Sequence, residues 1–327
     1  MTSNQFSIRL HEARKMMGLS MEKLAELTGG IITKQSISRY EKGLMLPKRV
    51  AKLAMAKALN ISDSYFDGTN LKIDMPMLRT TSNGKLSEDE LQALEAKLSF
   101  WAEQYLAKEK EAGFPTQFNN PIEGTKISTL EDAIHAADLL REKWHCGDGP
   151  IASILRLLER KGIMILAATL PDYVFGMSTW ADKKHPLMIL DFNPEKSSVE
   201  KLRFTAVHEL AHLLLLFPED SPLRLEKRCD LFASFFLLPK LALIEELGSK
   251  KREKITLEEM IDIKELYGAS LAASIIAARD YGIITTEYKR AWYAEHIEPN
   301  PREIGSGHYA FPETLGKEKI VNSIIDS

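Results

Sequence analysis

Two histidines and a glutamate stand at the spacing of a zinc-binding helix. Residues 208–212 fit the pattern H-E-x-x-H and lie within an apolar stretch, residues 204–216. Side chains four residues apart on a helix share one face, so the imidazoles of His208 and His212 can reach the same ion. Glu209 is then placed to act as a general base on water activated by the ion. The pattern predicts a hydrolytic centre with one Zn²⁺ per chain.

A third ligand is available on the next apolar segment. Glu226 and Asp230 lie four residues apart in a predicted helix, residues 222–238, and a charge that faces a core needs a partner. We expect Glu226 to complete a His₂Glu site with an open fourth position, and Asp230 to accept the free ring N–H of a ligating histidine. Cys229 could compete as a thiolate, but one residue before Asp230 we expect it to point away from the Glu226 face as a buried thiol. The alternatives are a pair of core histidines and a solvated Glu226.

The wider pattern around these residues resembles the ImmA/IrrE family of bacterial metallopeptidases, over about residues 130–285. The resemblance implies a gluzincin-like zinc peptidase in which His208, His212 and Glu226 bind the metal and Glu209 is the catalytic base. Members of that family are associated with cleaving or inactivating repressor proteins, which implies a protein substrate, such as a repressor. Cys229 stands where the family usually has alanine, and Leu238 where methionine is common. The motifs that carry the resemblance are Arg203-Phe204-Thr205, the H-E-x-x-H pattern, Glu226-x-x-Cys229-Asp230-x-Phe232-Ala233 and Leu237-Leu238-Pro239.

A second set of residues, near the N-terminus, points to DNA. Residues 1–60 hold eleven Lys or Arg against four Glu or Asp, whereas the rest of the chain is acidic. The motifs Leu24-Ala25-Glu26-Leu27, Gln35 to Gly43 and Pro47 resemble the Xre/Cro helix-turn-helix family over residues 5–66. A positive local charge is what contact with phosphate requires. We therefore expect double-stranded operator DNA as a partner, and the alternative is an interaction module with a merely solvated basic surface.

The helix-turn-helix elements can be placed from their caps and breaks. We expect five short helices within residues 6–66, with Ser20 and Thr33 as N-caps, Gly29-Gly30 as a break and Gly43 as a stop. The third helix offers its N-terminal half to base edges. Its candidate DNA-binding residues are Lys34, Gln35, Ser38 and Arg39, and the residues expected to hold the helices together are Leu24, Ile37 and Leu53.

These patterns predict a multidomain protein. An all-α helix-turn-helix domain, residues 1–68, precedes a linker and long helix, residues 69–128, and an α+β zincin-like domain with a small sheet and the H-E-x-x-H helix, residues 129–290. An irregular tail, residues 291–327, follows. The long helix carries one apolar seam, expected to pack on the second domain, with a dimeric coiled coil as the alternative. The seam residues are Leu91, Leu94, Leu98, Trp101 and Tyr105.

Composition narrows the class of protein. The 327 residues contain two cysteines, too few for a disulfide framework, and no apolar run of membrane-spanning length. The N-terminus lacks the pattern of a secretory signal, so we expect a cytoplasmic protein with no membrane partner. The leading hypothesis is a DNA-binding regulator with a zinc-dependent peptidase domain, acting as a homodimer on its operator. The alternative is a non-catalytic or antitoxin-like transcription factor whose metal domain is a sensor or structural module.

Overall fold

Four helices and a short 3₁₀ turn form the N-terminal region, as the caps in the sequence predict. Ser20 and Thr33 accept hydrogen bonds from the backbone N–H three residues further on, which starts the second and third helices. Gly29 and Gly30 adopt φ values of 67° and 78°, a region that glycine enters without strain. The elements are α1 (Ser3–Met16), α2 (Met21–Leu27), α3 (Lys34–Glu41), α4 (Arg49–Ala58) and the 3₁₀ helix η1 (Asp63–Asp67).

The core of this helical group confirms two of the three expected packing residues. Leu24 and Ile37 are fully buried, but Leu53 is 44 % exposed, so its expected core role is wrong. Helix α4 instead turns Met55 into the core, and its C-cap residue Leu59, one turn further on, is also buried. Because two residues correspond to about 200° of helix rotation, Leu53 lies on the opposite side from Met55.

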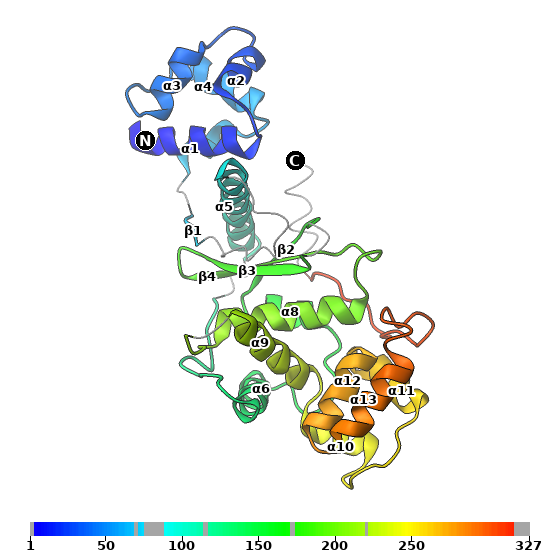
Figure 1. Cartoon of the computed structure of the whole chain (residues 1–327). Helices are drawn as coiled ribbons and strands as arrows, with labels where there is room; N and C mark the ends of the chain where they lie inside the picture. Colours follow the sequence, from blue (N-terminus) through cyan, green and yellow to red (C-terminus); the bar gives the residue numbers. More distant parts are fainter. Residues whose placement is uncertain are drawn as a thin grey trace. The chain divides into compact units, whose positions relative to one another are not determined.

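The computed structural model describes residues 3–68, 71–74, 88–113, 117–170, 174–219 and 222–316. It contains two compact units, described separately below (Figure 1). The first comprises residues 1–115 with 180–184, and the second comprises the remainder. The first unit is therefore larger than the domain of residues 1–68 expected from the sequence. Among the described residues, no helix is long and apolar enough to cross a membrane.

The long helix α5 (Glu88–Glu111) belongs to the first unit, where it packs on α1. Arg9 of α1 forms an ion pair with Glu103 of α5 at 2.6 Å, and Phe100 packs edge-on against Tyr65. The sequence placed this helix in a connecting segment. Most of the expected linker lies outside the described residues, but it includes the two-residue strand β1 (Ile73–Asp74), where no strand was predicted. In the apolar seam, Leu98, Trp101 and Tyr105 are buried, while Leu91 and Leu94 are half-buried.

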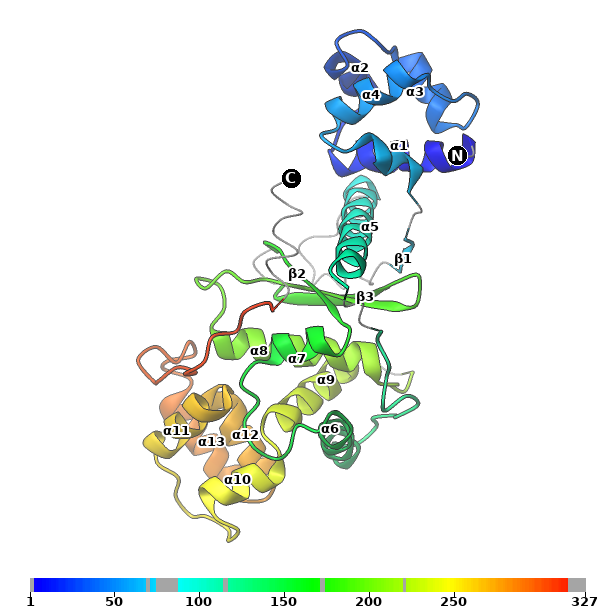
Figure 2. The same ribbon diagram turned by 180° about the vertical axis from the view of Figure 1, so that it is seen from behind.

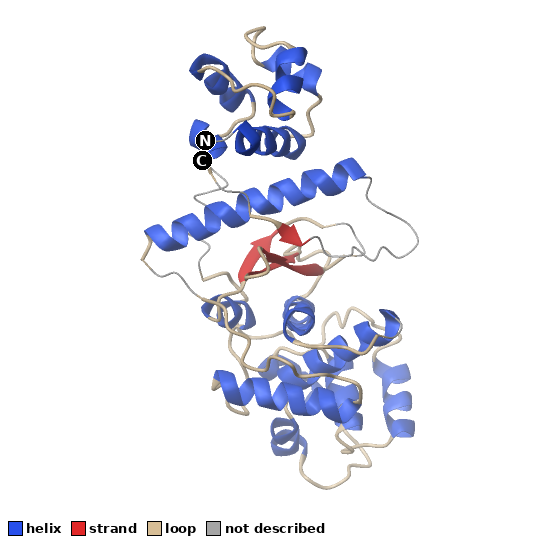
Figure 3. Cartoon of the chain, turned by 90° about the vertical axis from the view of Figure 1, so that its left-hand side faces the viewer, coloured by secondary structure: helices blue, strands red, loops and turns tan. Residues whose placement is uncertain are grey.

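The second unit combines helices with short strands, as Figure 3 shows by colour. The small sheet expected for this region is confirmed, and its strand order is β1-β3-β4-β2. Strand β2 pairs in parallel with β4, and β1 pairs antiparallel with residues 180 and 181, which belong to the first unit. The elements are α6 (Leu130–Trp144), α7 (Ile154–Arg160), β2 (Met164–Ala167), β3 (Gly176–Ala181), β4 (His185–Leu190), α8 (Val199–Leu214), α9 (Pro222–Leu237), α10 (Lys240–Leu247), α11 (Leu257–Tyr267), α12 (Leu271–Asp280) and α13 (Thr286–His296).

Helix α8 is central to the second unit. It packs on β4 and on α9, and α9 in turn packs on α6 (Figures 1 and 2). The stretch of α8 from Thr205 to Leu214 is largely buried, which fits a helix covered on several sides. The fold thereby brings strand β3 and the polar residues of α9 to the H-E-x-x-H pattern on α8.

The C-terminal region differs from the irregular tail expected for residues 291–327. Helix α13 extends to His296, and residues 297–316, although not helical, are held by buried charges. Glu303 pairs with Lys264 of α11 at 2.9 Å, and Glu313 pairs with Arg203 of α8. Hydrophobic periodicity could not predict this packing, because the buried apolar residues Ile297, Tyr309 and Leu315 are widely spaced, and buried carboxylates supply the other anchors.

Candidate metal centre and DNA-binding helix

The three predicted metal ligands converge on one point of the second unit. His208 Nε2 lies 3.1 Å from Glu226 Oε2 and 3.3 Å from His212 Nε2, and His212 Nε2 lies 3.7 Å from Glu226 Oε2. Around a tetrahedral zinc with bonds of about 2.0–2.1 Å, neighbouring ligand atoms are about 3.3 Å apart. The three atoms therefore form a triangle of the size that a zinc ion requires.

Asp230 holds the imidazole of His208 from its other side. The Nδ1–H of His208 donates to Asp230 Oδ1 at 2.9 Å. Such a bond fixes the ring orientation and leaves Nε2 directed at the ligand triangle, as in histidine sites whose second nitrogen is held by a carboxylate. The structure thus brings together all four residues predicted around the ion, and zinc binding itself stays a prediction.

Protons compete for the same nitrogens. Burial pulls the pKa of His208 down, but hydrogen bonds to Asp230 and Glu226 outweigh it and raise the pKa to about 9. Hydrogen bonds from His208 and His212 hold the pKa of Glu226 well below its usual range. A positively charged imidazolium at His208 therefore balances the carboxylates. A divalent cation would supply that charge in its place and displace the proton.

Glu209 is buried and held by the sheet. Its Oε2 accepts a hydrogen bond from Ser178 Oγ of β3 at 2.7 Å. Strand β3 passes so close to α8 that a Cβ on Gly176 would lie 2.6 Å from Thr205 Cγ2 and 3.3 Å from Glu209 Cγ. Sequence reasoning missed Ser178 and Gly176, because no spacing links β3 to α8. The one available signal was a glycine inside a strand-like run, residues 173–180, and such a glycine often marks close backbone approach.

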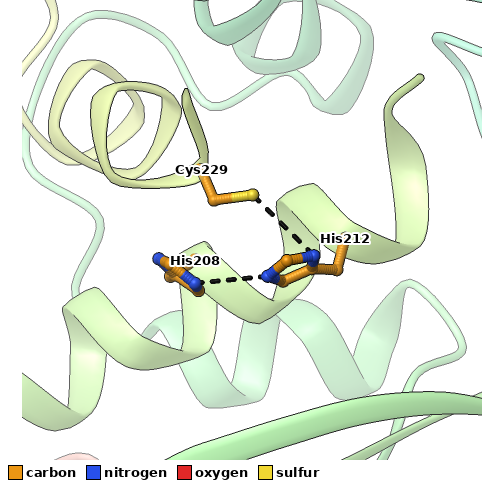
Figure 4. Close-up of side chains that lie close together, drawn as sticks. All are labelled: His208, His212 and Cys229. Carbon is orange, nitrogen blue, oxygen red and sulfur yellow. Dashed lines mark hydrogen bonds between the residues drawn. The ribbon is translucent and has the colours of Figure 1, made fainter. Parts of the chain in front are cut away.

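Cys229 also reaches this centre, contrary to the sequence expectation. It is fully buried, and its Sγ lies 3.9 Å from His212 Nδ1 (Figure 4). Three residues after Glu226 on a helix, Cys229 shares the face of that glutamate, so the prediction that it points away is wrong. Burial, together with the carboxylates of Glu226 and Glu209, raises the pKa of the Cys229 thiol.

The structure thus offers two sets of three donor groups. One consists of His208, His212 and Cys229, which each present a donor atom within 4.8 Å of the other two. The other replaces Cys229 with Glu226, and we favour it as the primary set. In that set both histidines use Nε2, and those two atoms face Glu226 directly, whereas Cys229 Sγ approaches His212 on its Nδ1 side.

The predicted DNA-contacting residues lie on α3 of the first unit. Lys34, Gln35 and Arg39 are exposed, and Ser38 is half-buried. Lys34 forms an exposed ion pair with Glu22 of α2. The opposite face of α3 enters the core through Ile37 and Tyr40, so the polar face is presented outward.

The end of α3 is fixed to α1. Glu41, its last residue, accepts hydrogen bonds from Arg14 Nε at 2.6 Å and from Arg14 Nη2 at 2.8 Å. Helices α2 and α3 are short and are joined by a glycine turn. Helix α3 is anchored to α1 and exposed along one side. This arrangement defines a helix-turn-helix domain.

The comparison with known families agrees with this class. Residues 10–66 match the family model described as Helix-turn-helix. The chain is thus a DNA-binding transcription regulator in its N-terminal region, and the second unit lies outside the matched residues. No curated protein matches the chain.

Proposed function

We propose that the second unit is a zinc-dependent peptidase, joined in one chain to a DNA-binding regulator. The observation that carries this proposal is the ligand triangle of His208, His212 and Glu226 beside the buried carboxylate of Glu209. A structural zinc site takes four protein ligands and has no use for a general base. Three ligands and an adjacent carboxylate are the arrangement of a hydrolytic centre.

Each residue has a distinct role in this proposal. Zinc, when bound, would supply Lewis acidity toward a peptide carbonyl and toward water. A Glu209 carboxylate oxygen would take the proton of the attacking water and deliver it to the leaving amine. Ser178 would orient that carboxylate through its 2.7 Å hydrogen bond, and Asp230 would orient His208 through its 2.9 Å bond.

The substrate we propose is a protein, and specifically a repressor. The resemblance of the zinc segment to metallopeptidases that act on repressors supports this class. The helix-turn-helix domain adds a physical reason, because binding to an operator raises the local concentration of the peptidase near other DNA-bound proteins. The domain would then act as a targeting element for the cleavage.

Metal content tests the proposal first. We expect about one zinc per chain by elemental analysis in the wild type and in Glu209→Gln, and strong loss in His212→Ala and Glu226→Ala. Glu209→Gln is the matched variant, since Gln keeps the shape of the side chain and removes only the base. Cleavage is then measured by mapping new protein N-termini in cells that express the wild type or Glu209→Gln.

The outcomes separate the two functional classes. New termini with the wild type but not with Glu209→Gln would support a peptidase. Zinc in both proteins, with identical termini, would favour the sensor or structural module instead. A wild type that takes up no metal even after reconstitution would refute the metal centre and leave the DNA-binding regulator alone.

A further inference from the structure

Four donor groups, rather than three, border the candidate metal centre. Besides the two histidines and Glu226, Cys229 directs its sulfur toward the imidazole of His212 (Figure 4). One donor atom from each of Cys229, His208 and His212 lies within 4.8 Å of the other two. The sulfur lies on the Nδ1 side of His212, so it would have to move toward the Nε2 side to share an ion with Glu226.

The two α9 donors differ in their chemistry and surroundings. The side chain of Glu226 is 44 % exposed, whereas Cys229, three residues later on the same helix face, is fully buried. Thiolate is a softer ligand than carboxylate and is favoured by zinc and by other thiophilic ions. An ion held by four protein groups is a closed site with no position left for water or substrate, whereas three groups leave one position open.

We propose that Cys229 is a fourth, exchangeable protein ligand, so that the centre has a closed form with four protein ligands and an open form with three. This inference rests on the proposed metal site. On closing, Cys229 would bind through its thiolate, displace the water of the open position and release the thiol proton to solvent; on opening, water would replace the sulfur and the thiol would take up a proton from solvent. The closed form would hold the ion without hydrolytic activity. The open form would leave one position for water, on which Glu209 would act as the general base.

Cobalt substitution of the full chain tests this ligand directly. A thiolate on Co²⁺ gives a near-ultraviolet sulfur-to-cobalt charge-transfer band, which imidazole and carboxylate ligands do not produce. We expect the band in the wild type and its loss in Cys229→Ala. Cys146→Ala is the matched control, because Cys146 is the other cysteine of the chain and should leave the band unchanged.

Zinc affinity and proton release give two further readouts. We expect Cys229→Ala to bind zinc roughly 10- to 100-fold more weakly, measured by competition with a chromophoric chelator. Calorimetry in buffers of different ionisation enthalpy should show that the wild type releases about one proton more than the variant on binding zinc. A cysteine that only accepted a hydrogen bond from His212 could weaken binding, but would give neither the band nor the extra proton.

The possible failures are distinguishable. A wild type that binds Co²⁺ without the charge-transfer band, or a band that persists in Cys229→Ala, would overturn the fourth ligand and leave the three-ligand peptidase intact. Absence of metal from the wild type would overturn the metal centre itself. Far-ultraviolet circular dichroism of Cys229→Ala, compared with Cys229→Ser, shows whether a lost band reflects a lost ligand or an unfolded chain.

Discussion

The ion pair between Arg203 and Glu313 is expected to carry a large share of the stability of the second unit. Both side chains are fully buried, and the other hydrogen-bond partners of Arg203 are backbone carbonyl oxygens of residues 151, 267 and 268. Glu313→Gln keeps the shape and an acceptor oxygen but leaves the guanidinium buried without a counter-charge. Breaking one side of a buried pair costs about 3–5 kcal/mol.

The capping role of Glu313 keeps the expected cost at or above the lower end of that range, because the NH₂ group of Gln cannot accept the hydrogen bonds that a carboxylate oxygen accepts. Its carboxylate accepts the backbone N–H groups of Ile154 at 2.8 Å and Leu155 at 3.1 Å, and the amide oxygen of Gln can keep one of these bonds. We therefore expect a loss of about 3 kcal/mol. For a unit of this size, this corresponds to roughly 6–12 °C in melting temperature.

Differential scanning calorimetry of the full chain measures this shift, with the first unit as an internal reference. The matched control is Glu295→Gln, in which an exposed carboxylate 3.9 Å from His296 loses its charge, and less than about 0.5 kcal/mol is expected. The double variant Arg203→Met, Glu313→Gln removes the uncompensated charge and should recover part of the loss. A Glu313→Gln shift under about 1 kcal/mol would refute the reasoning, because the Arg203 guanidinium would then tolerate burial without a counter-charge.

Three further predictions concern helix α3, a buried carboxyl in the first unit and the strand that passes over α8. Gln35→Ala and Arg39→Ala should each weaken specific operator binding by about 1–3 kcal/mol, measured by fluorescence anisotropy on operator and scrambled duplexes. Burial, countered by Arg9, raises the pKa of Glu12 to about 7. Because the folded state then holds this proton more tightly than the unfolded chain, stability falls as pH rises from about 4.5 to about 7. Glu12→Gln should abolish this dependence and, after solvent screening, stabilise the first unit by about 1–2 kcal/mol at pH 8 in urea denaturation. Gly176→Ala should cost the second unit about 1–3 kcal/mol in thermal denaturation, because its Cβ would press on Thr205 and Glu209.

Matched variants sharpen these three tests. Lys289→Ala, in the second unit, should leave operator affinity unchanged, and full affinity in Arg39→Ala would contradict base reading by α3. Glu26→Gln, exposed on α2, should leave the pH dependence as in the wild type. Gly149→Ala, where no atom lies within 4 Å of the added Cβ, should be nearly neutral. Equal losses at Gly149 and Gly176 would contradict the close contact of β3 with α8.

The parts of the site that lie on one helix could be predicted from spacing alone. His208 and His212 lie four residues apart on α8, and Glu226 and Asp230 lie four apart on α9, so each pair shares a face as expected. The same rule should have placed Cys229 with Glu226, three residues earlier. The step from Cys229 to Asp230 turns the helix by about 100°, whereas the three residues from Glu226 to Cys229 turn it by about 300° and return to nearly the same face.

Two carboxylates fix the C-terminal segment to the second unit, one through α8 and one through α11. Their burial cannot be predicted from hydrophobic periodicity. Glu313 and Glu303 each place a carboxylate at a helix N-terminus: Glu313 at α7, and Glu303 on the backbone N–H groups of Leu271 and Ala272 in α12. A carboxylate there satisfies orphan N–H groups and the positive end of the helix dipole, so it can be buried without any apolar periodicity. Each also neutralises a buried cation, Arg203 or Lys264. The loss of periodicity suggested that the domain ends at residue 290. A domain that ended there would leave the N-termini of α7 and α12 without their capping carboxylates, and Arg203 and Lys264 without their counter-charges. Residues up to Gly316 are therefore as much part of the folded second unit as α8.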